Sequence, residues 1–292
     1  MRPGWPESGP LNSRAMRANL YALGAIALWA TLAALGVSLA HLPPFLLTGT
    51  ALLIGSIPAW PLYRQWKIAP RTLALGIYGL FGFHFLLFIA LRHAPPVPAN
   101  LVNYLWPLFM VVLAPLLLPG VTLRAGHVLA ALLGFAGAAL AILGEPAANA
   151  GGAGGWAWGY LPALGSAFIW ASYSLLSKRV APFPTAAIGL FGLVSGLLAL
   201  LCHWALEPRA ALAGQDWLLL ALMGLGPLGG AFFLWDKALK LGDPRQIGIL
   251  SYLTPLGSTA LLIGVSGRAW SWSVALAAML IIGAAVLGTR AR

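Results

Sequence analysis

The segment VPANLVNYLWPLFMVVLAPLLL, residues 97–118, decides the fold class of this chain. It contains no Asp, Glu, Lys or Arg. A bilayer core is about 30 Å thick, so a spanning helix needs roughly 20 mostly apolar residues. The segment is long enough and apolar enough to be such a helix, and its asparagines, tyrosine and prolines form polar or bent points within it.

The composition extends this interpretation to the whole chain of 292 residues. Hydrophobic residues make up 60% and charged residues only 8%, whereas soluble domains carry roughly 25% charged residues. This polar surface is too small for a soluble enzyme, a nucleic-acid-binding protein or a disordered chain. The single cysteine, Cys202, excludes an intrachain disulfide and a cysteine metal cluster. We therefore expect an all-α integral membrane protein.

Charges and Pro/Gly clusters divide the chain into ten apolar stretches. The expected spans are 17–39, 43–63, 72–91, 97–118, 125–143, 156–177, 185–205, 216–236, 245–264 and 271–289. Residues 1–16 are expected to form a cytoplasmic tail, and residues 144–155 a Gly/Ala-rich tether. The tether separates a first five-helix repeat, 17–143, from a second, 156–289.

The distribution of positive charge predicts the orientation, because Lys- and Arg-rich loops stay in the cytoplasm. With the N-terminus inside, 14 of the 17 Lys and Arg residues fall on cytoplasmic segments and 3 on the outer ones. Both termini are then cytoplasmic. The net charge of +11 is thus a topology signal and predicts no nucleic-acid partner.

The first span has an alternative interpretation as a signal peptide. Arg14 and Arg17, an apolar run and Ser38-Leu39-Ala40 resemble a leader with its cleavage site. The apolar run is long for a leader, and the duplication described next needs this helix, so we favour a retained span.

Three pairs of segments indicate an internal duplication. Trp29 precedes Pro43 by fourteen residues, as Trp170 precedes Pro184. Residues 104–108 (YLWPL) recur 148 positions later as 252–256 (YLTPL), and 137–139 (GAA) recur as 283–285. Two halves of five helices each must enter the membrane from opposite sides. Such inverted repeats are typical of transporters that bind substrate near the midplane.

Titratable side chains are scarce inside the expected spans. His84, in the third span, is the only deep one; it could bind substrate, relay a proton or hydrogen-bond to a neighbouring helix. Asp236 stands at the end of the eighth span, where Lys240 at i+4 can pair with it.

Motifs for catalysis are missing from the sequence. There is no HExxH, no paired carboxylates and no Ser/His/Asp set at membrane depth. Residues 151–155 lack the Lys-Ser/Thr of a phosphate-binding loop, and no ATP-binding domain is present. We expect neither an enzyme nor a cofactor or metal site.

The fourth and ninth spans carry matching polar faces. Asn100, Asn103, Tyr104 and Pro107 lie at i, i+3, i+4 and i+7, on one helical face. The positions 148 residues later hold Gly248, Ser251, Tyr252 and Pro255. Proline removes a helical hydrogen bond, so both helices should kink and expose carbonyls. These faces should line protein or a watery cavity, and polar packing between helices is the alternative.

The tryptophans separate into two groups by depth. One group lies near span ends, as membrane-interface anchors do: Trp60, Trp66, Trp156, Trp158, Trp204, Trp217, Trp235, Trp270 and Trp272. Trp29, Trp106 and Trp170 lie near span centres instead, and with Tyr78 and neighbouring aromatic residues they could line a midplane cavity.

Small residues recur every fourth position in the fifth span, from Gly126 to Ala138, and Ala284 and Gly288 repeat the spacing in the tenth. They allow close helix approach, either within the chain or to a second copy. We expect a monomer or a weak homodimer.

The Leu28-Trp29-Ala30 and Ile169-Trp170-Ala171 segments, together with the paired Tyr-Leu-x-Pro-Leu segments, resemble the EamA-type drug/metabolite transporter superfamily over the whole chain. Residues 100–107 and the His84 region resemble its YddG-type exporters. The resemblance implies a basket of ten helices around a central cavity, with the fifth and tenth peripheral. It also implies export of aromatic and other hydrophobic amino acids across a bacterial inner membrane.

The cavity chemistry agrees with this resemblance. Aromatic faces and amides without a fixed charge suit a small aromatic or apolar zwitterion, whereas an anionic sugar phosphate would need Lys or Arg. We expect alternating access without ion coupling. The alternatives are a proton-coupled exporter of another neutral metabolite or drug using His84, a membrane-embedded enzyme and a scaffold. The expected substrate-binding residues are Trp106, His84, Asn103, Tyr104, Asn100, Tyr252, Ser251, Trp29, Trp170 and Tyr78, with helix kinks at Pro107 and Pro255.

Overall fold

The computed structural model describes residues 10–143, 157–266 and 272–290, and within these ranges every regular element is helical. The α-helices of the first half are α1 (Pro10–Ala30), α2 (Leu32–Ser38), α3 (Pro44–Ser56), α4 (Pro70–Ile77), α5 (Phe83–His93), α6 (Pro96–Asn103), α7 (Trp106–Leu117) and α8 (Ala125–Leu143). Those of the second half are α9 (Tyr160–Leu176), α10 (Ala187–Leu206), α11 (Gly214–Leu225), α12 (Ala231–Leu241), α13 (Pro244–Leu250), α14 (Leu253–Ser266) and α15 (Trp272–Arg290).

Three further elements have other helical geometries. The 3₁₀-helix η1 (Ile57–Trp66) continues α3, and two π-helical segments, η2 (Tyr78–Gly82) and η3 (Gly226–Gly230), continue α4 and α11. The two π-helical segments start 148 positions apart, at the offset of the Tyr-Leu-x-Pro-Leu pair. π-helical turns are rare and often occur at functional sites.

Eight helical stretches of the described residues are long and apolar enough to cross a membrane. They are Ser13–Ser38, Pro44–Trp66, Pro70–His93, Pro96–Leu117, Ala125–Leu143, Ala187–Leu206, Gly214–Leu241 and Trp272–Arg290. The other two expected spans correspond to α9, a helix of 17 residues, and to the interrupted pair α13–α14.

The helix boundaries differ most from the expected ones at two places. Helix α1 begins at Pro10, inside the expected tail 1–16, and proline is favoured in the first turn of a helix because it has no N–H to leave unpaired. Helix α12 ends at Leu241, five residues beyond the expected end of the eighth span. The tether expected at 144–155 lies outside the described residues.

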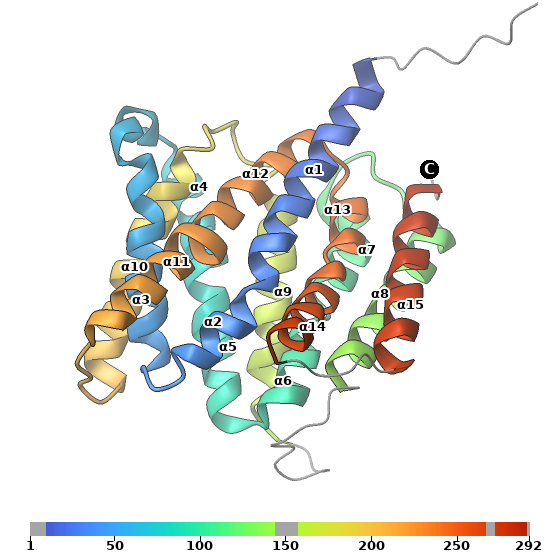
Figure 1. The fold of residues 1–292 in the computed structure, drawn as a ribbon. Helices are drawn as coiled ribbons and strands as arrows, with labels where there is room; N and C mark the ends of the chain where they lie inside the picture. Colours follow the sequence, from blue (N-terminus) through green and yellow to red (C-terminus); the bar gives the residue numbers. More distant parts are fainter. Residues whose placement is uncertain (1–9, 144–156, 267–271, 291–292) are drawn as a thin grey trace, which may run out of the picture.

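The helices form one bundle in which α1, α9 and α12 run through the middle (Figure 1). Helices α3 and α10 pack together at one edge, and α8 and α15 at the opposite edge. Helix α1 begins and α15 ends at the same end of the bundle.

Small residues bring the helices of both edge pairs close together. A Cβ on Gly49 of α3 would lie 3.0 Å from the carbonyl oxygen of Gly196 in α10, and one on Gly137 of α8 would lie 3.0 Å from that of Ala277 in α15. These approaches leave no room for a larger side chain.

Candidate functional site

Four tryptophans from four different helices meet in the centre of the bundle. Trp29 (α1), Trp106 (α7), Trp170 (α9) and Trp235 (α12) are each at most 8% exposed. Their ring centroids are 5.1–6.5 Å apart in all six pairs, mostly edge to face or tilted, the geometry that aromatic quadrupoles favour. We call these four residues the tryptophan cluster. The rings pack against one another, so in this structure they fill the centre rather than line an open cavity.

Hydrogen bonds orient two of the four indoles. Trp29 donates its Nε1–H to the carbonyl oxygen of Pro227 at 3.1 Å, and this carbonyl belongs to the π-helical segment η3. Trp235 donates its Nε1–H to Ser174 Oγ at 3.1 Å. Buried indole N–H groups need such partners, and both bonds join helices that are far apart in the sequence.

Phenylalanine and tyrosine rings surround the tryptophan cluster. Phe83, Tyr173 and Phe232 have their ring centroids 5.4–5.6 Å from that of Trp170. Phe232 is also 6.2 Å from Trp29. The centre is therefore a continuous aromatic surface without a fixed charge among its members.

His84 lies at the edge of this aromatic surface. Its side chain is buried, and its ring centroid is 6.4 Å from that of Phe232 and 6.1 Å from that of Phe88. His84 Nδ1 is 2.6 Å from the carbonyl oxygen of Leu80, an acceptor, so Nδ1 carries the hydrogen. A neutral imidazole then keeps Nε2 as an acceptor.

The polar face of α6 is divided between two environments. Asn103 is buried and donates Nδ2–H to Ser166 Oγ in α9 at 2.7 Å, and Ser166 donates onward to the carbonyl oxygen of Ala163. Asn100 is exposed and Tyr104 half-buried. α6 ends at Asn103 and α7 begins at Trp106, just before Pro107.

The corresponding residues of the second half lie elsewhere. α13 ends before Ser251, whose hydroxyl donates to the carbonyl oxygen of Gly248, and α14 begins two residues before Pro255. Tyr252 is fully buried and packs with Ala138 and Ile281, on the side of α8 and α15. Of the expected binding residues, the structure thus brings Trp29, Trp106 and Trp170 together, places His84 beside them and places Tyr252 at the edge.

Tyr78 joins the third span to α9. Its hydroxyl lies 2.8 Å from Ser172 Oγ, and Ser172 in turn donates to the carbonyl oxygen of Phe168. Tyr78 therefore packs against the central core. Among the described residues, no ring-to-ring contact joins it to the tryptophan cluster.

Trp235 corrects the sequence analysis, which assigned it to the membrane interface. It is only 1% exposed and sits in the centre of the tryptophan cluster. The sequence analysis ended this span at residue 236, but the helical stretch extends from Gly214 to Leu241. Trp235 therefore lies more than one helical turn from the end of the helix. Trp60, Trp158, Trp204, Trp217 and Trp272 are 48–92% exposed, while Trp156 and Trp270 lie outside the described residues.

The end of the bundle where α1 begins is held together by two lysines. The expected pair is confirmed: Lys240 Nζ lies 2.6 Å from Asp236 Oδ2. Lys240 also donates to the carbonyl oxygen of Phe183, and Thr185 donates to Asp236 at 2.6 Å. Lys178 donates to the carbonyl oxygens of Leu239 and Gly242, and its burial lowers its pKa.

Glu207 joins three helices at the opposite end. Its side chain is fully buried and accepts hydrogen bonds from the backbone N–H groups of Phe45 and Leu46, at the start of α3. It also pairs with Arg92 at 3.0 Å and His203 at 2.9 Å. The sequence could not reveal the contacts with Phe45, Leu46 and Arg92, which lie more than 100 positions away, whereas His203 is only four positions from Glu207.

Comparison with known proteins identifies the class first. The model of the EamA-like transporter family matches residues 16–143 and 157–290. Apolar helices and this match make the chain a multi-pass membrane transporter and not an enzyme. The chain belongs to the EamA-like transporter family.

Individual relatives narrow the comparison. The aromatic amino acid exporter YddG of Ancylobacter novellus is 41% identical over 283 residues, which cover 93% of this chain and 96% of that protein. An uncharacterized transporter of the sor 3′ region in Acidianus ambivalens is 26% identical over 71% of this chain and 79% of its own length. A solved structure described as "Crystal structure of protein" superposes with a TM-score of 0.87 at 41% identity, covering 94% of this chain and 97% of that one.

Proposed function

We propose that this transporter exports aromatic and other hydrophobic amino acids across the inner membrane of a bacterium. The observation that carries the proposal is the tryptophan cluster, four buried indoles contributed by both halves of the chain. The 41% identity to a protein named as an aromatic amino acid exporter supports the same substrate class.

The chemistry of the centre favours a substrate with an aromatic side chain. Indole edges and faces recognise another ring by edge-to-face contacts worth roughly 0.5–1.5 kcal/mol each. The substrate's ammonium and carboxylate need polar groups but no buried counter-charge. Asn100, Asn103 and Tyr104 supply such groups six, three and two residues before Trp106 along the fourth span.

The ten-span arrangement with two inverted halves is part of the proposal. Helix α5 and helix α12 both have 11 residues and follow π-helical segments that are 148 positions apart. Helix breaks after Asn103 and before Tyr252 lie in the same relative place. The family model matches one stretch on each side of the tether. With α9 and α13–α14 counted as spans, both halves have five.

The proposed cycle is alternating access, and the structure corresponds to a state closed on the cytoplasmic side. The bonds of Lys178 and Lys240 tie α9, the 180–186 connection and α12 at the end where α1 begins. Positive-inside bias assigns that end to the cytoplasm. At the opposite end, α2 has no buried residue and Asn100 is exposed. A substrate would then leave from the outer face of the tryptophan cluster.

Facilitated transport is the favoured energetic mode, because no Asp, Glu, Lys or Arg takes part in the central aromatic contacts. Purified protein in liposomes should equilibrate labelled Phe and Trp without any ion gradient. An empty-liposome control defines the background. No equilibration of either amino acid, with protein present in the bilayer, would contradict the proposal.

The alternative is proton-coupled export through His84, whose Nε2 could accept a proton. This mode predicts accumulation only under a pH gradient, and loss of gradient-driven accumulation in His84→Gln. Accumulation of labelled Phe above its equilibrium level under an imposed pH gradient separates the two modes, because a facilitator reaches the same final level with or without the gradient.

A further inference from the structure

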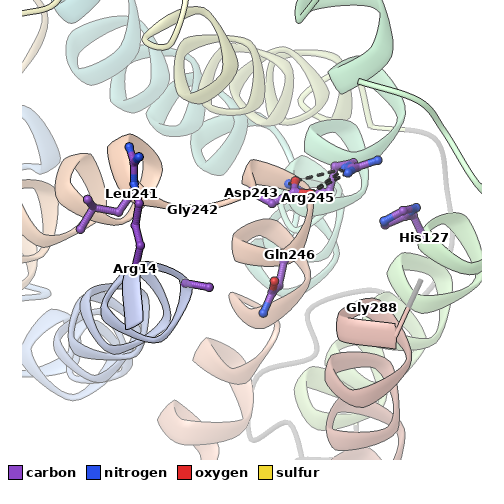
Figure 2. A pocket seen from close by; sticks show the side chains of 9 residues that line it. Arg14, His127, Leu241, Gly242, Asp243, Arg245, Gln246 and Gly288 are labelled. Carbon is purple, nitrogen blue, oxygen red and sulfur yellow. Dashed lines mark hydrogen bonds and ion pairs between the residues drawn. The ribbon is translucent and has the colours of Figure 1, made fainter. Parts of the chain in front are cut away.

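A pocket of about 410 Å³ with charged residues in its wall opens at the end of the bundle where α1 begins, away from the tryptophan cluster. Its walls come from α1, α8, α13 and α15 and from the connection between α12 and α13 (Figure 2). The side chains that matter below are Arg14, His127, Asp243, Arg245 and Gln246.

The pocket has an excess of positive charge. Asp243 pairs with Arg245 at 2.6 Å, and these contacts outweigh burial and hold the pKa of Asp243 below its usual range, so this pair is neutral overall. Arg14 is exposed, and its guanidinium donates to the carbonyl oxygen of Lys240 at 3.4 Å; it forms none of the ion pairs found among the described residues. A carbonyl does not neutralise its charge, which remains available to an anion.

His127 adds an unsatisfied polar atom to the same wall. The residue is only 4% exposed, and its Nδ1 has no hydrogen-bond partner. Buried polar atoms are almost always paired, so an orphaned one indicates a missing partner. Figure 2 shows His127 on α8 across from the guanidinium of Arg245, with Gln246 below.

The helices that carry His127 and Gly288 also present exposed apolar side chains. Leu129 of α8 is 51% exposed and Val286 of α15 is 45% exposed, on other faces of these two helices than the pocket residues. Exposed apolar side chains on membrane-spanning helices face lipid tails. An anionic group in the pocket could therefore be the head of a molecule whose tails lie on α8 and α15.

We propose that this pocket binds the phosphodiester headgroup of an anionic phospholipid, held by Arg14 and His127. Basic pockets between spanning helices on the cytoplasmic side are suited to such headgroups. The assignment of this lipid to the inner leaflet rests on the proposed orientation. The binding of a phosphodiester group by Arg14 and His127 does not depend on the orientation. The same side chains could bind free inorganic phosphate, but phosphate has no acyl tails to contact the exposed apolar side chains of α8 and α15.

The test is native mass spectrometry of the purified, delipidated full chain with added lipid. Phosphatidylglycerol should bind at one site more tightly than phosphatidylcholine. Arg14→Gln and His127→Leu should each weaken this first binding roughly tenfold, the effect of losing one charge-assisted or buried hydrogen bond. His127 Nδ1 has no hydrogen-bond partner in the protein, so His127→Leu breaks no bond of Nδ1. It therefore serves as the second variant if Arg14→Gln disturbs folding. Arg71→Gln removes one exposed cationic side chain, outside the pocket, and is the matched control.

Retained affinity in Arg71→Gln with loss in the other two supports the proposal. Equal phosphatidylglycerol affinity in all variants, or an equal loss in Arg71→Gln, would overturn it. An added arm contains inorganic phosphate alone at millimolar concentration. If phosphate occupies the pocket and phosphatidylglycerol does not compete with it, the lipid assignment is wrong.

Discussion

The rings of His84 and Phe232 lie 6.4 Å apart, and the two residues are 148 positions apart in the sequence. This is the offset that relates η2 to η3. Residues at equivalent positions of two repeats can touch only close to the axis that relates the repeats. The contact therefore supports the proposal that the aromatic centre lies on an approximate twofold axis.

Trp29 and Trp170 form a second pair of this kind. They begin the matching segments of the two halves, and their ring centroids are 5.8 Å apart. A substrate on the axis would be contacted by both halves at once, which is what a site that opens alternately to either side requires.

Trp106→Ala should lower export of Phe and Trp about tenfold or more. The variant loses edge-to-face contacts with Trp29 and Trp235, at 6.5 and 5.6 Å, and each is worth roughly 0.5–1.5 kcal/mol to a packed or substrate-bound state. Flux into proteoliposomes is the measurement, normalised to protein content.

Trp204→Ala is the matched control, because Trp204 is 80% exposed. It should transport like the wild type. Trp106→Phe retains an aromatic ring and should fall between the two. Wild-type flux from Trp106→Ala would remove Trp106 from the binding site.

The hydrogen bond between Trp235 and Ser174 should be measurable by a double-mutant cycle. Ser174→Ala leaves a buried indole N–H unpaired, which costs about 1–3 kcal/mol, whereas Trp235→Phe with Ser174→Ala leaves no orphan. We expect a coupling of about 1 kcal/mol in thermal unfolding of the detergent-solubilised protein. Additive effects of the two substitutions would show that the bond contributes nothing.

Glu207→Gln should destabilise the protein by about 1–3 kcal/mol, seen as a lower melting temperature. The neutral side chain keeps an acceptor for the start of α3 but loses the charge that pairs with Arg92 and His203. Arg92 is partly exposed, so Arg92→Gln should cost less. An Arg92→Gln protein that melts lower than Glu207→Gln would contradict this ranking.

The sequence predicts the helical architecture well because span length is a local property. Eight of the ten expected stretches correspond to helical stretches of sufficient length and apolarity. It also identifies Trp29, Trp106 and Trp170 as deep residues, and the structure brings them together. Counting residues from charged ends is enough for both results.

The sequence is less informative where depth depends on helix geometry or on distant contacts. Trp235 was misplaced because the π-helical segment and the extended α12 move the helix end to Leu241. Tyr252 lies in the break between α13 and α14, and it packs toward α8. Helical spacing defines a face but not the neighbour that the face meets.

Gly79→Ala should destabilise the protein, whereas Gly283→Ala should not. A Cβ on Gly79, inside the π-helical segment η2, would overlap the ring of Tyr173, which packs on Trp170. Such overpacking costs typically about 1–3 kcal/mol and should lower both melting temperature and flux.

Nothing lies within 4 Å of a Cβ added to Gly283, in helix α15. Alanine there has a higher helix propensity than glycine, by up to about 1 kcal/mol, so the melting temperature should stay the same or rise. The pair tests whether η2 must approach α9 without a side chain. Equal melting temperatures for the two variants would mean that Tyr173 can move aside, and that the π-helical segment does not need glycine at this contact.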